Sequence, residues 1–394
     1  MYNLNTHYEN IFHYLNTIIA DPRLLYLMPY GSTSPKNLEF IMNNLGMWPG
    51  KRGPLFVCYD QEPILGEFNF ELLDHVCDNY LDGDKFILLT TEKNSETLDT
   101  IKARYNCLVV YYFHHVFAAH DWFRGQRFNS QLIEPSKRSL AKKYITFNRL
   151  TSGKRVYRSL LISELIKRDI LDQGYVSYND VCPENNQNFI DNLVDAVDAK
   201  LINPEIMVDA ARNIMKAGLP LRIDYRSEPA IPNHSFTLSA VTHTQRSFVY
   251  VVTETCYWEQ KCHLTEKIFK PIVSKMPFIL VGPAHNLAYL HSYGFKTFDR
   301  WFDESYDTIE DPMARMSMIG TVLADLCSSS FHDLECVLAE MQEVLDYNYN
   351  LFYSQEFIDR CWSELTLGLQ DVCEQIVIDP ELKASSDLHR MLTL

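Results

Sequence analysis

The chain has 394 residues, of which 46% are hydrophobic and 22% are charged, and it contains 14 Gly and 17 Pro. This composition is typical of a globular protein with room for two domains, and it excludes a disordered or fibrous chain. The formal net charge is -15. An acidic excess of that size argues against a protein that coats nucleic acid or an anionic membrane, because neutralising phosphates requires a surplus of Lys and Arg.

Targeting signals and paired cysteines are absent from the sequence. No run of 18 apolar residues occurs, and the first residues, MYNLNTHYENIFHYL, lack the basic and apolar regions of a signal peptide. The ten cysteines are dispersed without a C-x-x-C pair. We therefore expect a cytoplasmic protein with reduced, buried thiols and no membrane partner.

The first 135 residues alternate between predicted strands and predicted helices. Short β-branched and aromatic runs at 54–60, 85–91 and 107–113 are typical of buried parallel strands. Residues 68–81 and 95–105, which lie between these runs, have helical patterns. Strands that alternate with helices predict a parallel sheet in an α/β domain.

The same alternation returns in the second part of the chain. Its predicted elements are strands at 142–150, 247–255 and 277–282 and helices at 154–172, 187–217 and 265–275. From about residue 305 the pattern is almost wholly helical. We expect an α/β domain over 1–140, a second over 141–330, and C-terminal helices over 331–394 that cross back to the first domain.

The charge is unevenly spread along the chain. Residues 1–143 carry 14 basic and 16 acidic side chains, residues 144–272 carry 15 of each, and residues 273–394 carry 7 and 20. Pro135 to Ser163 contains no Asp or Glu. Its eight basic residues are Lys137, Arg138, Lys142, Lys143, Arg149, Lys154, Arg155 and Arg158.

Two interpretations of this basic window stay open. It forms a solvated charged face, or it binds an anion. Four of these residues, Arg149, Lys154, Arg155 and Arg158, fall where a predicted strand ends and the next helix begins. At this edge open α/β sheets bind ligands and helix N-termini bind phosphate. Neither a Walker loop nor a G-x-G-x-x-G fingerprint is present.

A second polar group lies about 100 residues further on. Glu254 ends a predicted strand, and Thr265 and Glu266 begin the next helix. Lys267 and Lys270 are three residues apart, so both face one side of that helix and could reach one pyrophosphate. An ordinary N-cap at Thr265 followed by an acidic first turn explains part of the same pattern.

These two segments together resemble a known family. Residues 247–283 resemble the donor-binding segment of the α1,3-fucosyltransferases, in which a strand ending in F-E-N is followed by a helix that opens with T-E-K. Asn148 and Arg155, seven positions apart, resemble the family's upstream S-N segment. The chain also looks like glycosyltransferases of large phages and viruses, which share a DQEP segment and a T-E-K-x-F-K-P segment.

The resemblance implies a GT-B glycosyltransferase, with two Rossmann-like domains that face each other across a cleft and a helical C-terminal region. The donor would be a UDP- or GDP-linked sugar, bound by the second domain. Asn148 and Arg155 would lie by the diphosphate, Glu254 beside the donor, Glu266 at the ribose and Lys267 at the phosphates. The family's F-E-N reads Thr253-Glu254-Thr255 here, so fucose is not implied.

Combining the motifs with the resemblance gives nine predicted donor-binding residues. They are Asn148, Arg149, Arg155, Arg158, Glu254, Thr265, Glu266, Lys267 and Lys270. Basic side chains and helix N-termini can stabilise a leaving diphosphate, so we expect no metal requirement. The closest D-x-D sequence is Asp82-Gly83-Asp84, which is typical of a turn, and the spacing of His115 and His120 does not favour zinc.

An inverting transfer needs a general base for the acceptor hydroxyl. Asp60 and Glu62 directly follow a predicted buried strand, and they are our catalytic candidates. His114 and Asp121 remain alternatives. The acceptor is a glycan or, given the phage likeness, a hydroxymethylated base of phage DNA. A nucleotide- or glycan-binding protein of the same fold without catalysis is the alternative function.

Overall fold

A computed structural model describes residues 6–27, 45–48, 53–64, 67–81, 85–129, 132–223 and 241–378. The chain divides into two compact units. Unit 1 comprises Met1–Asp121 and Gln355–Leu394, and unit 2 comprises Trp122–Ser354. The division therefore falls about 20 residues before the expected position. Of the expected C-terminal helical segment, 331–354 belongs to unit 2, and only the last helix, α15 (Gln355–Ile378), belongs to unit 1.

Unit 1 is built on a five-stranded sheet with the order β2-β1-β3-β4-β5. Its strands are β1 (Arg23–Leu27), β2 (Leu45–Trp48), β3 (Leu55–Tyr59), β4 (Phe86–Thr90) and β5 (Leu108–Tyr111). Only the β1–β2 pair is antiparallel. The three strands predicted in this part of the chain are confirmed as β3, β4 and β5.

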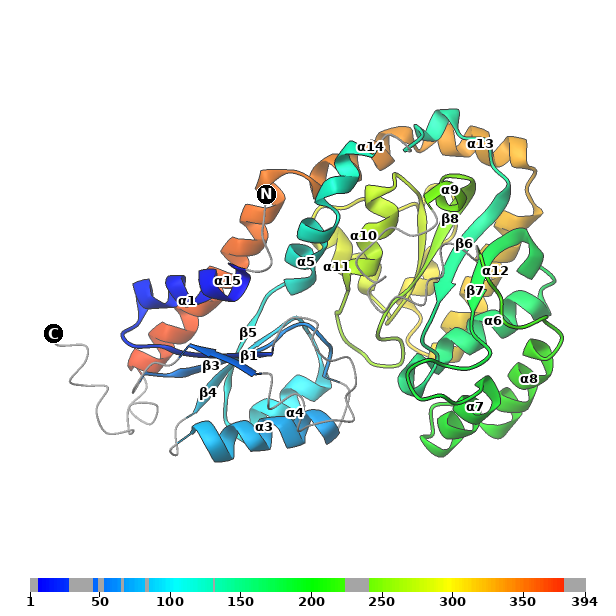
Figure 1. Ribbon diagram of the computed structural model, residues 1–394. Coiled ribbons are helices and arrows are strands. Elements are labelled where there is room, and N and C mark those ends of the chain that lie inside the picture. Colours follow the sequence, from blue (N-terminus) through cyan, green and yellow to red (C-terminus); the bar gives the residue numbers. More distant parts are fainter. Residues whose placement is uncertain are drawn as a thin grey trace. The chain divides into compact units, whose positions relative to one another are not determined.

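Helices cover both faces of this sheet (Figure 1). They are α1 (His7–Ile18) and α15 on one face, and α3 (Glu67–Tyr80) and α4 (Glu96–Tyr105) on the other, with α5 (His114–Trp122) following β5. Because successive side chains of a strand point to opposite faces, Leu55, Val57 and Tyr59 of β3 pack on the α3 and α4 side. Burial on both faces explains why these strands are continuously apolar.

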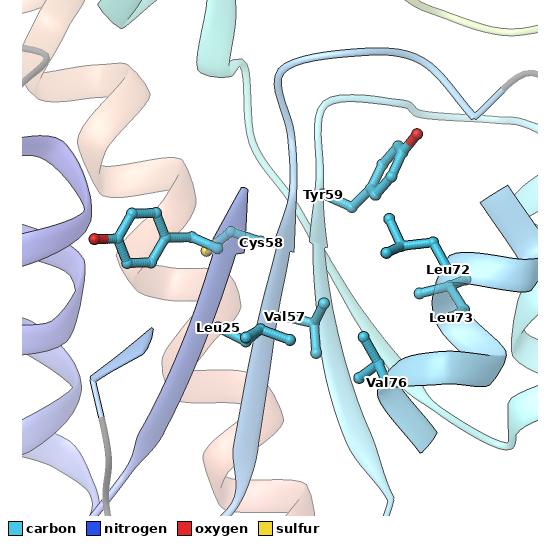
Figure 2. Close-up of a pocket in the computed structure, with 8 residues that line it drawn as sticks. Leu25, Val57, Cys58, Tyr59, Leu72, Leu73 and Val76 are labelled. Carbon is cyan, nitrogen blue, oxygen red and sulfur yellow. The ribbon is translucent and has the colours of Figure 1, made fainter. Parts of the chain in front are cut away.

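An apolar pocket lies within this core, between the strands and α3 (Figure 2). Its lining includes Leu25, Val57, Leu72, Leu73 and Val76, all of which belong to the buried core cluster. The pocket offers almost no polar surface, so it is a gap in side-chain packing and lacks the polar groups that a ligand site needs.

Unit 2 is built on a fully parallel four-stranded sheet with the order β7-β6-β8-β9. Its strands are β6 (Lys142–Asn148), β7 (Gly174–Tyr178), β8 (Ser247–Thr253) and β9 (Phe278–Val281). Its helices are α6 (Tyr157–Lys167), α7 (Phe189–Asp198), α8 (Pro204–Ile214), α9 (Val241–Gln245), α10 (Glu266–Val273), α11 (Asn286–Ser292), α12 (Pro312–Ser328), α13 (Phe331–Glu340) and α14 (Gln342–Phe352). Because the strands are parallel, their carboxyl ends lie at one edge.

Two helix predictions need correction. The helix expected over 154–172 begins with a 3-10 turn at Gly153–Val156 and ends at Lys167, two residues before Asp169, whose φ of 57° is left-handed. The segment 187–217 is two helices, α7 and α8, the second opened by Pro204 after an Asn203 cap. The α/β class with two units on largely parallel sheets is confirmed. No helix among the described residues combines the length and hydropathy needed to cross a membrane.

Candidate functional site

The basic window is largely used within unit 2. Arg138 donates to the carbonyls of Ile133 and Ser274. Lys142 and Lys143 each donate to a backbone carbonyl.

The remaining basic side chains of the window differ in their surroundings, and Arg155 among them pairs with Glu184. Arg158 is buried and donates to the carbonyls of Leu150, Thr253 and Glu254. Lys154 lies 2.7 Å from Glu259. Only Lys137 and Arg149 are classed as exposed. Arg138, Lys143 and Arg158 are buried, so the window is not a solvated face along its whole length.

Six of the nine predicted donor-binding residues come together at the carboxyl end of β8. We call this group the strand-end cluster. It consists of Arg158, Glu254, Thr265, Glu266, Lys267 and Lys270. The residues come from α6, from the end of β8 and from the start of α10, so the sheet edge brings together side chains more than 100 positions apart in sequence.

Glu254 is the centre of the strand-end cluster. Its side chain is fully buried, and its two oxygens accept hydrogen bonds from the Thr265 backbone N–H at 3.3 Å and the Thr265 hydroxyl at 2.6 Å. Its backbone carbonyl accepts from the Tyr157 hydroxyl and from Arg158 at 3.0 Å. Burial raises the pKa of Glu254, while the nearby Lys267 opposes that rise. Glu254 thereby fixes the start of α10 against the sheet.

Thr265 caps α10 as predicted. Its hydroxyl oxygen accepts from the Lys267 backbone N–H at 3.3 Å. Lys267 extends its ammonium back over this first turn, 2.9 Å from Glu266 and 3.1 Å from the Thr265 hydroxyl. The helix N-terminus and one cation therefore face the same edge of the sheet, the arrangement that favours an anion.

Lys270 differs from Lys267 in having no carboxylate within 4 Å of its ammonium among the described residues. Burial lowers its pKa to about 8, and Lys267 and Arg158 act in the same direction, whereas Glu266 and Glu254 act against it. Its side chain thus lies among the charges of the strand-end cluster while its ammonium is not committed to an ion pair. It is the cation best placed to accept an anionic ligand.

The other three predicted residues lie outside the cluster. Arg155 forms an ion pair with Glu184 at 3.0 Å, and Ser152 also donates to that carboxylate. Arg149 is exposed at the end of β6. Asn148 is buried at the end of β6, and its side-chain oxygen has no hydrogen-bond partner in the described structure.

In unit 1, Asp60 is buried at the end of β3 within a network of hydroxyl groups. The Tyr8 hydroxyl donates to one carboxylate oxygen at 2.8 Å, and the Tyr112 hydroxyl donates to the other. Gln61 in turn donates to the Tyr8 hydroxyl at 2.8 Å. With 1% of its surface exposed, Asp60 has no room for a substrate hydroxyl, whereas Glu62 is exposed.

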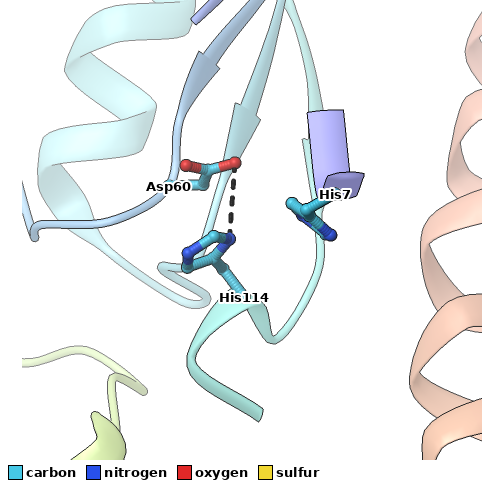
Figure 3. Close-up of side chains that lie close together, drawn as sticks. All are labelled: His7, Asp60 and His114. Carbon is cyan, nitrogen blue, oxygen red and sulfur yellow. Dashed lines mark ion pairs between the residues drawn. The ribbon is translucent and has the colours of Figure 1, made fainter. Parts of the chain in front are cut away.

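His114 belongs to the same network. Its Nδ1 lies 3.7 Å from Asp60 Oδ2, the pair that Figure 3 marks with a dashed line. The His114 ring is fully buried. Burial lowers the pKa of His114, and Asp60 partly opposes this. Asp82, Gly83 and Asp84 lie outside the described residues.

Sequence reasoning missed the partners of the predicted residues. Glu184 lies in a loop with no motif, 29 positions after Arg155, and Thr255 accepts from the Lys267 ammonium at 3.3 Å. No local pattern marks either residue, since their proximity is created by the pairing of β6 with β7 and by the turn after β8. Comparison of the chain with protein-family models, with curated proteins and with solved structures gives no match.

Replacing Thr265 with Val will destabilise unit 2 by about 2–4 kcal/mol. The change removes an N-cap, which contributes about 1 kcal/mol, and one of two donors to a buried carboxylate, which contributes about 1.5–3 kcal/mol. Urea unfolding of both proteins measures this difference. Thr265→Ser keeps the hydroxyl and will stay within about 1 kcal/mol of the wild type; equal losses in both variants would contradict the assigned role.

Proposed function

We propose that the protein is a glycosyltransferase that moves a sugar from a UDP- or GDP-linked donor to an acceptor hydroxyl. The strand-end cluster carries this proposal. It places a capped helix N-terminus and two lysines at the carboxyl end of a parallel sheet, where nucleotide ligands of α/β proteins bind. We further propose the GT-B architecture, with unit 2 binding the donor.

The leaving diphosphate is stabilised by Lys267, Lys270 and the first turn of α10 in this proposal. Positive charge arranged before the reaction stabilises the charge that develops on the leaving group. The transfer step then needs no metal ion. Asn148 and its unpartnered side-chain oxygen at the end of β6 would meet the donor.

Glu62 is our proposed general base, because a base must reach the proton that it removes. Asp60 is held by two tyrosines and is buried, so we assign it a positioning role. The cations of the basic window are mostly committed to groups within unit 2, so they give no support to binding of DNA phosphates, and we favour a glycan acceptor.

Nucleotide-sugar turnover tests the proposal directly. The protein is incubated with a panel of UDP- and GDP-linked sugars, and release of free nucleotide is followed with and without glycan acceptors. One donor will be turned over. Lys267→Ala removes a cation that stabilises the leaving diphosphate, so it will lower the rate at least tenfold, which corresponds to about 1.4 kcal/mol of lost transition-state stabilisation. Lys167→Ala, on the exposed side of α6, is the matched control. Nucleotide binding without turnover of any donor would instead favour a non-catalytic binding protein.

Donor affinity will depend on the protonation of Lys270. Since its pKa is lowered to about 8, the ammonium is protonated below that pH and attracts phosphate, and the affinity falls as the pH rises through 8. Calorimetric titration with UDP and GDP between pH 6.5 and 9.5 measures this loss, which we expect to be about tenfold. Lys270→Arg stays charged and will bind with little pH dependence. The same decline in Lys270→Arg as in the wild type would exclude Lys270 as its source.

Glu184 competes with the donor for Arg155. Glu184→Gln removes the carboxylate from the ion pair, so Arg155 can bind the diphosphate, and we expect the dissociation constant for UDP or GDP to fall about three- to tenfold. Glu164→Gln, which breaks the Arg168 pair elsewhere on α6, is the control. An unchanged constant in Glu184→Gln would mean that Arg155 does not contact the nucleotide.

A further inference from the structure

Unit 1 gathers three side chains of the kind that bind metal ions. His7 is the first residue of α1, Asp60 follows β3, and His114 follows β5 and opens α5. Their ligand atoms all lie within 4.8 Å of one another (Figure 3). All three residues are at most 1% exposed. Three separate segments of the chain therefore contribute to one buried cluster of side chains.

Tyr112 adds a fourth ligand atom to this group. Its hydroxyl oxygen lies 2.9 Å from His7 Nε2 and 3.1 Å from His114 Nδ1, and the hydroxyl donates to Asp60 Oδ2. Ligand atoms of a tetrahedral zinc ion, bound at about 2.0–2.1 Å, lie about 3.3 Å apart. The two Tyr112 separations are shorter than that value, and the 3.7 Å between His114 Nδ1 and Asp60 Oδ2 is longer. The His7, Asp60 and His114 ligand atoms lie within 4.8 Å of one another, so side-chain shifts would be needed to complete the site.

The electrostatics of the group favour a cation. No Lys or Arg of the described residues lies within 4 Å of the Asp60 carboxylate. Burial lowers the pKa of His7 and of His114, the two imidazoles of the group. A buried carboxylate without a counterion is costly even when it accepts hydrogen bonds.

We propose that His7, Asp60, Tyr112 and His114 form a closed site for a divalent transition-metal ion such as Zn²⁺. Two imidazole nitrogens and two oxygens form the mixed donor set that suits Zn²⁺ and Co²⁺, whereas Mg²⁺ and Ca²⁺ prefer oxygen ligands alone.

Asp60 would supply one negative charge to the ion, and Tyr112 would contribute the hydroxyl oxygen that lies beside both imidazoles. Four protein ligands leave no open position, which is typical of a structural site. The ion would fasten α1 to the ends of β3 and β5, and this role does not depend on the proposed sugar transfer.

Metal binding to the full-length protein tests the site. The protein is dialysed against a chelator and titrated with Co²⁺, whose visible absorption reports tetrahedral N/O coordination, and with Zn²⁺. We expect one equivalent to bind and the thermal unfolding midpoint to rise by more than about 5 °C with excess Zn²⁺. Substoichiometric binding with no absorption band and no change in midpoint would overturn the proposal and leave a metal-free hydrogen-bond network.

Variants separate this site from adventitious binding. His7→Gln and Tyr112→Phe will each weaken Zn²⁺ binding at least tenfold. Tyr8→Phe removes a hydrogen bond to the other oxygen of Asp60 but no ligand, so it will bind Zn²⁺ as the wild type does. His13→Gln, on the exposed side of α1, controls for surface histidines. Unchanged affinity in both ligand variants would place the ion elsewhere; if neither variant folds, the wild-type stoichiometry and Co²⁺ spectrum decide.

Discussion

The buried carboxylate of Glu254 is the constraint on which the candidate site of unit 2 depends. A carboxylate with no exposed surface is tolerated only where donors satisfy it, and Thr265 supplies two of them. The same hydroxyl group caps α10, so the end of β8 and the start of α10 cannot move independently. Lys267 and Lys270 follow on α10, and their position at the sheet edge results from this one attachment.

The buried charged side chains of the two units have different partners. In unit 2, Arg158 binds the carbonyl oxygens of Thr253 and Glu254, so a cation crosses from α6 to the end of β8 and stabilises the chain there. In unit 1, the buried Asp60 accepts hydrogen bonds from two tyrosine hydroxyls, and the His114 imidazole lies 3.7 Å away. The buried cation is thus satisfied by backbone carbonyl oxygens, and the buried anion by side-chain hydroxyl groups.

Much of the fold could be predicted from the sequence, because periodicity is a local property. Six of the described strands, β3, β4, β5, β6, β8 and β9, were found from their apolar runs, whereas β1, β2 and β7 were missed. Thr265 was recognised as a helix cap from its neighbours alone. The basic window was harder to interpret. Its lysines and arginines look available along the sequence, but Arg138 and Arg158 reach carbonyls that are 95 or more positions away. Such contacts have no local signature, and neither has the pairing of Arg155 with Glu184.

The sequence by itself determined the α/β class, the alternation of strands and helices, and the residue types that end β6 and β8. These features follow from side-chain patterns that repeat over a few residues, so they do not depend on contacts between distant parts of the chain. Only the tertiary structure decided which charged groups are available to a ligand. Burial and pairing depend on which strands lie side by side. The edge of the unit 2 sheet brings Lys270 to the strand-end cluster and removes Arg158 from solvent, and in unit 1 the end of β3 removes Asp60 from solvent.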